Sequence, residues 1–161
     1  MKKTKILSLL LILAICLSAL ISCGGADGEG EAYIVIERTE NGAPVFDLYR
    51  VELSALEDRT NGAVGLIEYL AASSPFKYTL NTSGSYGAFI EAIGGLNPNA
   101  LENEYISIYT SESVDFAVPS AYYPVVATVD YNGNTLTLSG VGISSMTVKD
   151  GTTILFRIEK Y

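Results

Sequence analysis

The amino-acid sequence predicts an α+β domain in which a mostly antiparallel or mixed β-sheet packs on a single main α-helix. Short apolar runs with strand-like alternation stand before and after one segment whose apolar residues recur at helical spacing. In addition, two Asn-Gly pairs separate neighbouring runs, and such pairs are typical of tight hairpins between antiparallel strands.

The first two strands are expected at residues 32–37 and 45–53, with Asn41-Gly42 between them as the turn. The second run carries apolar side chains on both of its faces, which indicates some cover on both sides of the sheet.

One helix is expected next, because apolar residues follow at positions i, i+3, i+4 and i+7: Ala63, Leu66, Ile67 and Leu70. Thr60 or Asn61 can cap its start, and Ser73-Ser74-Pro75 ends it. Gly62 and Gly65 weaken the first turn.

The rest of the chain reads as strands. Residues 76–80 and 105–110 alternate strictly, whereas residues 86–93 fit either a strand or a short helical piece. Three further strands are expected at residues 125–131, 135–138 and 153–161, with Asn132-Gly133 as a type I′ turn between the first two.

The N-terminus has the features of an export signal. Three lysines precede an apolar run at residues 6–21 that is short for a membrane span. Leu20-Ile21-Ser22-Cys23 resembles the lipobox of bacterial lipoproteins. The resemblance implies a signal peptide at residues 1–22, lipidation of Cys23 and an extracytoplasmic domain anchored to a bacterial membrane in the cell envelope. The alternatives are an ordinary signal peptide or an anchor helix that happens to carry a cysteine.

Removal of residues 1–22 changes the composition of the chain. Three lysines and no acid are lost, which takes the formal charge from -8 to -11. Cys16 is lost as well and Cys23 is lipidated, so we expect no disulfide. Residues 23–31 form a flexible, acidic, Gly-rich tether, and residues 32–161 form one domain, which we expect to be monomeric.

The composition excludes several function classes. The chain has no His, which rules out Ser-His-Asp and Cys-His catalysis, and we expect no enzymatic activity. The acidic balance makes nucleic acid an unsuitable partner and leaves the lipid as the contact with the membrane. Asp130-Tyr131-Asn132-Gly133-Asn134 is interpreted as a hairpin turn and not a calcium loop, so no metal site is expected.

Three segments resemble the transcobalamin-like C-terminal domain, the β domain of vitamin B12 carrier proteins. They are residues 62–70 with Phe76-Lys77-Tyr78, residues 84–96, and residues 140–143 followed by 148–156. The resemblance covers residues 32–161, with an insertion at about 112–136. The chain departs from the family at Ile106, where members usually have Trp. Within the insertion, Tyr122 and Tyr123 suit either an aromatic ligand contact or a hydrophobic plug.

The resemblance implies a binding protein that captures a corrinoid, such as cobalamin or cobinamide, or a similar large small molecule for a membrane importer. No cofactor is required. The alternative is a surface protein-interaction or adhesion module without a small-molecule ligand. A corrin has a wide apolar face with an amide rim, which calls for aromatic surface and backbone or hydroxyl hydrogen-bonding groups.

The residues expected to supply that surface are Tyr86, Phe89, Tyr105, Ile106, Tyr109, Leu138, Ser139, Gly140 and Val141. Gly140 and Gly142 would let the backbone approach a ligand closely. For each of these residues a place in the core or in a turn is the alternative.

Overall fold

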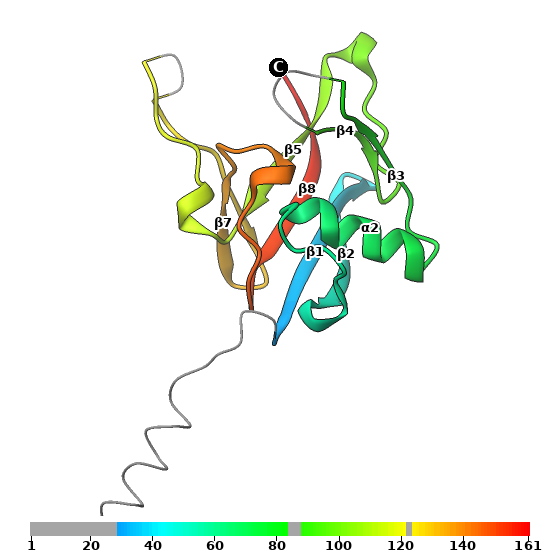
Figure 1. Ribbon diagram of the computed structural model, residues 1–161. Helices are drawn as coiled ribbons and strands as arrows, with labels where there is room; N and C mark the ends of the chain where they lie inside the picture. The colour runs from blue at the N-terminus through cyan, green and yellow to red at the C-terminus, as the bar shows by residue number, and fades with distance from the viewer. Residues whose placement is uncertain (1–28, 84–87, 122–123) are drawn as a thin grey trace, which may run out of the picture.

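The computed structural model describes residues 29–83, 88–121 and 124–161 (Figure 1). The predicted lipidation site Cys23 and the tyrosines Tyr86, Tyr122 and Tyr123 lie outside the described residues. No helix in the described ranges has the length and apolar character needed to cross a membrane.

Eight strands and one α-helix make up the regular structure of the described residues. In chain order they are β1 (Glu31–Glu40), β2 (Ala43–Glu52), α2 (Ala63–Ser73), β3 (Tyr78–Asn81), β4 (Phe89–Ile93), β5 (Glu104–Thr110), β6 (Thr128–Tyr131), β7 (Asn134–Leu138) and β8 (Thr153–Lys160). Short 3₁₀ turns lie between them at η1 (Leu53–Ala55), η2 (Ala100–Glu102), η3 (Ser113–Asp115) and η4 (Ile143–Ser145).

The main sheet has six strands in the order β2-β1-β8-β5-β7-β6, and β3 and β4 form a separate two-stranded sheet. β1 and β8 pair in parallel, and the other neighbours pair antiparallel. The predicted α+β class with a mostly antiparallel, mixed sheet is therefore confirmed. The sequence of residues 86–93 fitted either a strand or a short helical piece, and the structure has the strand β4 at Phe89–Ile93.

Both Asn-Gly turns are hairpins. The φ angles are 52° and 80° at Asn41 and Gly42, and 49° and 79° at Asn132 and Gly133. Two successive left-handed residues are what a type I′ turn requires, and its twist matches that of the flanking strands. The predicted β1–β2 and β6–β7 hairpins are confirmed.

The helix ends as predicted but begins differently. At its end, both the backbone N–H and the hydroxyl of Ser74 donate to the Leu70 carbonyl, at 2.9 and 2.6 Å. The prediction of Thr60 or Asn61 as the N-cap is wrong, because Gly62 occupies that position with a φ of 54°. A Cβ on Gly62 would lie 2.7 Å from the Ile143 carbonyl oxygen, so glycine lets the helix start lie against η4.

The main hydrophobic core joins the helix to the sheet. Buried residues of α2, including Leu66 and Ile67, share one cluster with Ile34 and Ile36 of β1 and Phe156 of β8. In Figure 1 the helix lies in front of β1 and β2, and the β3–β4 sheet lies beside them. This core fixes the position of the helix C-terminus relative to β3.

A second, smaller core lies on the opposite face of the main sheet. It consists of Val35, Tyr109, Leu136 and Leu155, which are fully or almost fully buried. The sheet curls around this core, because Phe46 on the edge strand β2 meets Tyr131 on the other edge strand β6, with ring centroids 5.1 Å apart.

Residues 112–136 form part of that curl. They contain η3, all of β6 and the beginning of β7. The strand predicted at residues 125–131 is shorter than expected, because only Thr128–Tyr131 pairs with β7. β6 and β7 thus widen the main sheet at one edge.

Candidate functional site

The predicted site residues of β5 lie on opposite faces of the sheet. Tyr109 is 1% exposed and belongs to the second core, whereas Ile106 is 7% exposed and belongs to the main core. Tyr105 shares the Tyr109 face and is half-buried, with its ring 5.9 Å from that of Tyr161. This separation follows from the period of two along a strand.

The segment from Leu138 to Val141 is occupied by contacts within the chain. Leu138 pairs with Tyr109, and the Ser139 N–H donates to the Ile108 carbonyl at 2.8 Å. The Gly140 N–H donates to the Asp115 carbonyl at 2.8 Å. A Cβ on Gly140 would lie 2.8 Å from the Cα of Ala117, so the close backbone approach at Gly140 is to the chain itself.

Phe89 stands apart from these residues. It opens β4, in the two-stranded sheet, and 61% of its surface is exposed. Val141 packs against the main core. The structure therefore brings Tyr105, Tyr109 and Leu138 to one face and places Phe89 and Ile106 elsewhere.

Around Tyr105 and Tyr109 lies a polar group that we name the Glu159 cluster: Tyr105, Ser107, Tyr109, Arg157 and Glu159. The Glu159 carboxylate accepts hydrogen bonds from Ser107 at 2.6 Å, from Tyr109 at 2.6 Å and from Tyr105 at 3.4 Å. Burial, together with the hydrogen bond to Glu159, raises the pKa of Tyr109 well above its ordinary value. Tyr109 therefore stays protonated near neutral pH and acts as a hydrogen-bond donor, not as a base.

Arg157 connects this cluster to β1. Its Nη1 lies 3.3 Å from Glu37, and its buried Nε lies 3.3 Å from a Glu159 oxygen, an ion-pair distance without the alignment of a hydrogen bond. Burial raises the pKa of the Glu37 carboxyl, although the charge of Arg157 opposes the shift. Glu37, Arg157 and Glu159 were not among the predicted site residues. The available signal for Arg157 and Glu159 was the alternation of charged and apolar residues at the end of β8, whereas Glu37 directly follows the apolar run of β1.

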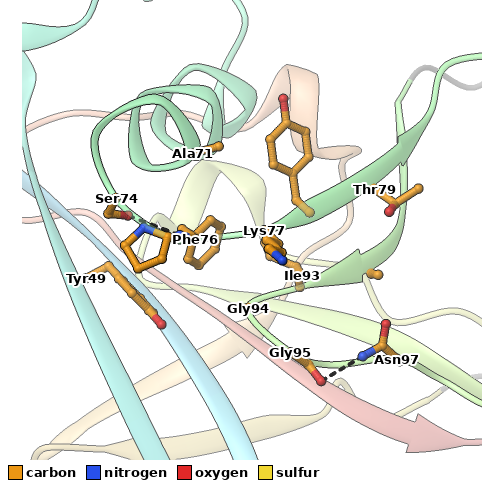
Figure 2. Close-up of a pocket in the computed structure, with 13 residues that line it drawn as sticks. Tyr49, Ala71, Ser74, Phe76, Lys77, Thr79, Ile93, Gly94, Gly95 and Asn97 are labelled. Carbon is orange, nitrogen blue, oxygen red and sulfur yellow. Dashed lines mark hydrogen bonds between the residues drawn. The ribbon is translucent and has the colours of Figure 1, made fainter.

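A separate open pocket of about 740 Å³, which we name the helix-end pocket, lies where the end of α2 meets β3 and β4 (Figure 2). Ligand sites commonly have volumes of ~300–1,000 Å³. The residues that line it are Tyr49, Ala71, Ser74, Pro75, Phe76, Lys77, Tyr78, Thr79, Ala92, Ile93, Gly94, Gly95 and Asn97.

Aromatic rings form one wall of the helix-end pocket. Tyr49 and Phe76 meet edge to face with centroids 4.8 Å apart, and Figure 2 shows both rings below the end of the helix. Phe76 is held by its own N–H, which donates to the Ser74 hydroxyl at 3.3 Å. Phe76 is 6% exposed and belongs to the main core, so the half-buried ring of Tyr49 supplies the more accessible apolar surface.

Glycine backbone forms another part of the lining, where Gly94 packs against Ile36 and Phe76 and the space beside Gly95 is open. Gly94 and Gly95 have φ angles of 54° and 89°, and the Gly94 N–H donates to the Lys77 carbonyl at 2.9 Å. The Asn97 side-chain amide donates to the Gly95 carbonyl at 3.0 Å, as Figure 2 shows. No side chain would contact a Cβ on Gly95, so this turn leaves its backbone open to the pocket.

None of the eight predicted ligand contacts that lie within the described residues lines the helix-end pocket. The available signal was the pair of breaks Gly94-Gly95 and Asn97-Pro98 directly after an apolar strand. Sequence patterns gave no indication that this turn would lie beside the end of the helix.

Within the described ranges, no group of three or more His, Cys, Asp or Glu side chains is arranged to hold a metal ion. Asp130 instead accepts a 2.7 Å hydrogen bond from the Thr135 hydroxyl across the β6–β7 hairpin, which agrees with its interpretation as a turn residue.

No protein-family model matches the sequence, and no curated protein matches it either. The solved structures that match the chain include the following two. A protein from Ruminococcus gnavus ATCC 29149, described as a proposed metal-binding protein, has a TM-score of 0.49 and 11% identity, covering 83% of this chain and 99% of its own. Haptocorrin in complex with Cbi has a TM-score of 0.46 and 16% identity, and the match covers 87% of this chain but 28% of haptocorrin. At these identities and scores, neither structure assigns a ligand or an activity to this chain.

Proposed function

We propose that the protein is a lipid-anchored, extracytoplasmic binding protein that captures a corrinoid or a similar large small molecule and passes it to a membrane importer. The observation that carries the binding role is the helix-end pocket, which is lined by aromatic rings and by the open backbone of Gly95. The motif resemblance to the transcobalamin-like domain supports the choice of ligand.

The chemistry of the helix-end pocket suits a ligand with a flat apolar face and a polar rim. Rings supply dispersion contacts. Within the described residues, the hydroxyls of Tyr49, Tyr78 and Thr79 form no hydrogen bond, so they are available to a polar rim. Because the pocket is open, a ligand larger than its volume can rest one face there and project into solvent.

Ligand capture is tested with the full chain, produced in a bacterium and purified in detergent. Cyanocobalamin and cobinamide are titrated separately, and the corrin absorption and the melting temperature are recorded. At ~100 µM, a ligand with a Kd a hundredfold lower raises the free energy of unfolding by roughly 2.7 kcal/mol. No change with either compound would refute the corrinoid assignment.

Lipid anchoring is tested on the same preparation by mass spectrometry. We expect a chain that begins at Cys23 and carries a diacylglyceryl group, and we expect the Cys23→Ser variant to lose both the lipid and membrane retention. A wild-type chain without lipid would contradict the anchor.

One observation favours the alternative of a protein-interaction module. Val114, Val118 and Val125, in the insertion, are 75%, 84% and 83% exposed. Replacing all three with Ser would abolish binding to an envelope protein but leave corrinoid titrations unchanged, so the two functions can be separated.

A further inference from the structure

Lys77 differs from the other Lys and Arg side chains of the described residues, because it forms no ion pair with a carboxylate. Among the seven Lys and Arg side chains in residues 29–161, five form ion pairs with carboxylates: Arg38, Arg50, Lys149, Arg157 and Lys160. Arg59 is also engaged. Lys77 is exposed, and no ion pair or hydrogen bond of its ammonium group is recorded.

This unmatched cation lines the helix-end pocket, whose lining contains no Asp or Glu. Glu91, next to the lining residue Ala92 along β4, instead accepts a 3.0 Å hydrogen bond from the Asn81 amide. Figure 2 shows Lys77 beside Phe76 and Ile93 at the centre of the lining.

A second cavity within the described residues has the opposite charge pattern. A pocket of about 460 Å³ on another side of the same helix is lined by Glu57, Asp58 and Glu68 and by no cation. In a chain with 18 acids and 10 cations, an acidic lining is the ordinary case, and the helix-end pocket departs from it.

The net negative charge of the chain does not prevent an anion from binding there. At physiological ionic strength the Debye length is about 8 Å, so exposed acids beyond that distance are largely screened. The local ammonium group then decides the sign of the field inside the pocket, and a charge-assisted contact contributes more than a neutral one.

We infer that the helix-end pocket selects ligands that combine a flat apolar body with an anionic group, a carboxylate, phosphate or sulfonate, and that Lys77 is the counter-charge. The apolar body lies against the half-buried Tyr49 ring, beside the edge of Phe76, and the anion is bound at the Lys77 ammonium. This inference rests on the proposed function only in taking the pocket as a ligand site, since it requires no corrinoid.

The test uses two fluorescent probes that differ by one anionic group, 1-anilinonaphthalene-8-sulfonate and uncharged N-phenyl-1-naphthylamine, titrated into the full chain in detergent below its micelle concentration. We expect Lys77→Gln to raise the Kd of the sulfonate about tenfold, which corresponds to ~1.4 kcal/mol, and to leave the uncharged probe unchanged. Added salt should weaken sulfonate binding by the wild type and have little effect on the variant.

Two matched variants locate the effect. Lys160→Gln removes the same charge from an exposed lysine that pairs with Glu102 and Glu104, and should leave both affinities unchanged. Thr79→Trp fills the pocket from an exposed strand position and should weaken both probes.

Three results would overturn the inference: sulfonate affinity that Lys77→Gln leaves unchanged, equal weakening of both probes by that variant, or sulfonate binding that Thr79→Trp leaves intact. If neither corrinoid binds but the sulfonate binds as expected, the proposed ligand is refuted and the anion site is retained. The reverse pair of results would refute the anion site alone.

Discussion

The phenol of Tyr109 donates a 2.6 Å hydrogen bond to the Glu159 carboxylate across the β5–β8 pair, although Tyr109 is 1% exposed. Ser107 donates to the same carboxylate, at 2.6 Å. A charged acceptor in this position is stable because several donors face it, and the removal of one donor leaves an oxygen with poor solvation.

Tyr109→Phe should therefore lower the free energy of unfolding by ~1–3 kcal/mol, the usual range for a hydrogen bond to a charged group and its unsatisfied partner. Urea denaturation measures the change. Tyr161→Phe is the control, because Tyr161 is 83% exposed, and it should have little effect. A Tyr109→Phe variant as stable as the wild type would show that the cluster contributes nothing.

Alkaline pH should weaken the fold through the same residue. The pKa of Tyr109 is raised by burial and by its bond to Glu159, so the unfolded chain loses the phenolic proton first. The contribution of the protonated Tyr109 to the free energy of unfolding is complete below pH 10.0, the ordinary pKa of tyrosine, and is lost as the pH rises above it. Denaturation series on either side of that pH should show a smaller alkaline loss in Tyr109→Phe than in the wild type; equal losses would contradict the prediction.

Glu37 should make the free energy of unfolding depend on pH in the acidic range. Its pKa is raised above 4.5, with burial as the main cause, so ionisation costs the folded state more than the unfolded chain. Below pH 4.5 the Glu37 carboxyl is protonated in both states and this free-energy cost is absent. The cost grows as the pH rises from 4.5 towards the pKa of the folded state. The stability of Glu37→Gln relative to the wild type should therefore increase across that range in urea titrations, whereas a constant difference would refute it.

Gly62→Ala should destabilise the protein by ~1–3 kcal/mol, because its φ of 54° is left-handed and the new Cβ would lie 2.7 Å from the Ile143 carbonyl. Gly133→Ala is the matched control, since Gly133 also has a positive φ but nothing lies within 4 Å of its Cβ position. Thermal denaturation should show the larger loss for Gly62→Ala. Equal losses would mean that backbone strain alone, and not the contact with η4, sets the cost.

The location of ligand binding can be decided by a pair of substitutions. Thr79→Trp in the helix-end pocket should weaken corrinoid binding, and Tyr105→Ala on β5 should leave it unchanged, because the two residues belong to different sheets. Absorption titrations compare the variants. The opposite result would place the ligand at the face of Tyr105 and Tyr109.

The sequence was sufficient where a local rule determined the structure. Two of the three Asn-Gly pairs, Asn41-Gly42 and Asn132-Gly133, separate strand patterns and form type I′ turns, and Ser74 supplies a local acceptor and donor at the helix end. Both features could therefore be predicted. The helix cap at Gly62 could not be predicted, because its cause is contact with Ile143, 81 residues along the chain. The helix-end pocket arises in the same way, from the approach of Gly94 and Gly95 to Lys77 and the end of α2.

The contact between Phe46 and Tyr131 bears on how copies of this domain behave when crowded. Free edges of an open sheet are templates for strand pairing between molecules, which leads to aggregation. Here the two edge strands meet through these rings, and Pro44, Asp47 and Arg50 along β2 further disfavour an added strand. The curl of the sheet therefore protects neighbouring copies from joining edge to edge, even at high local concentration.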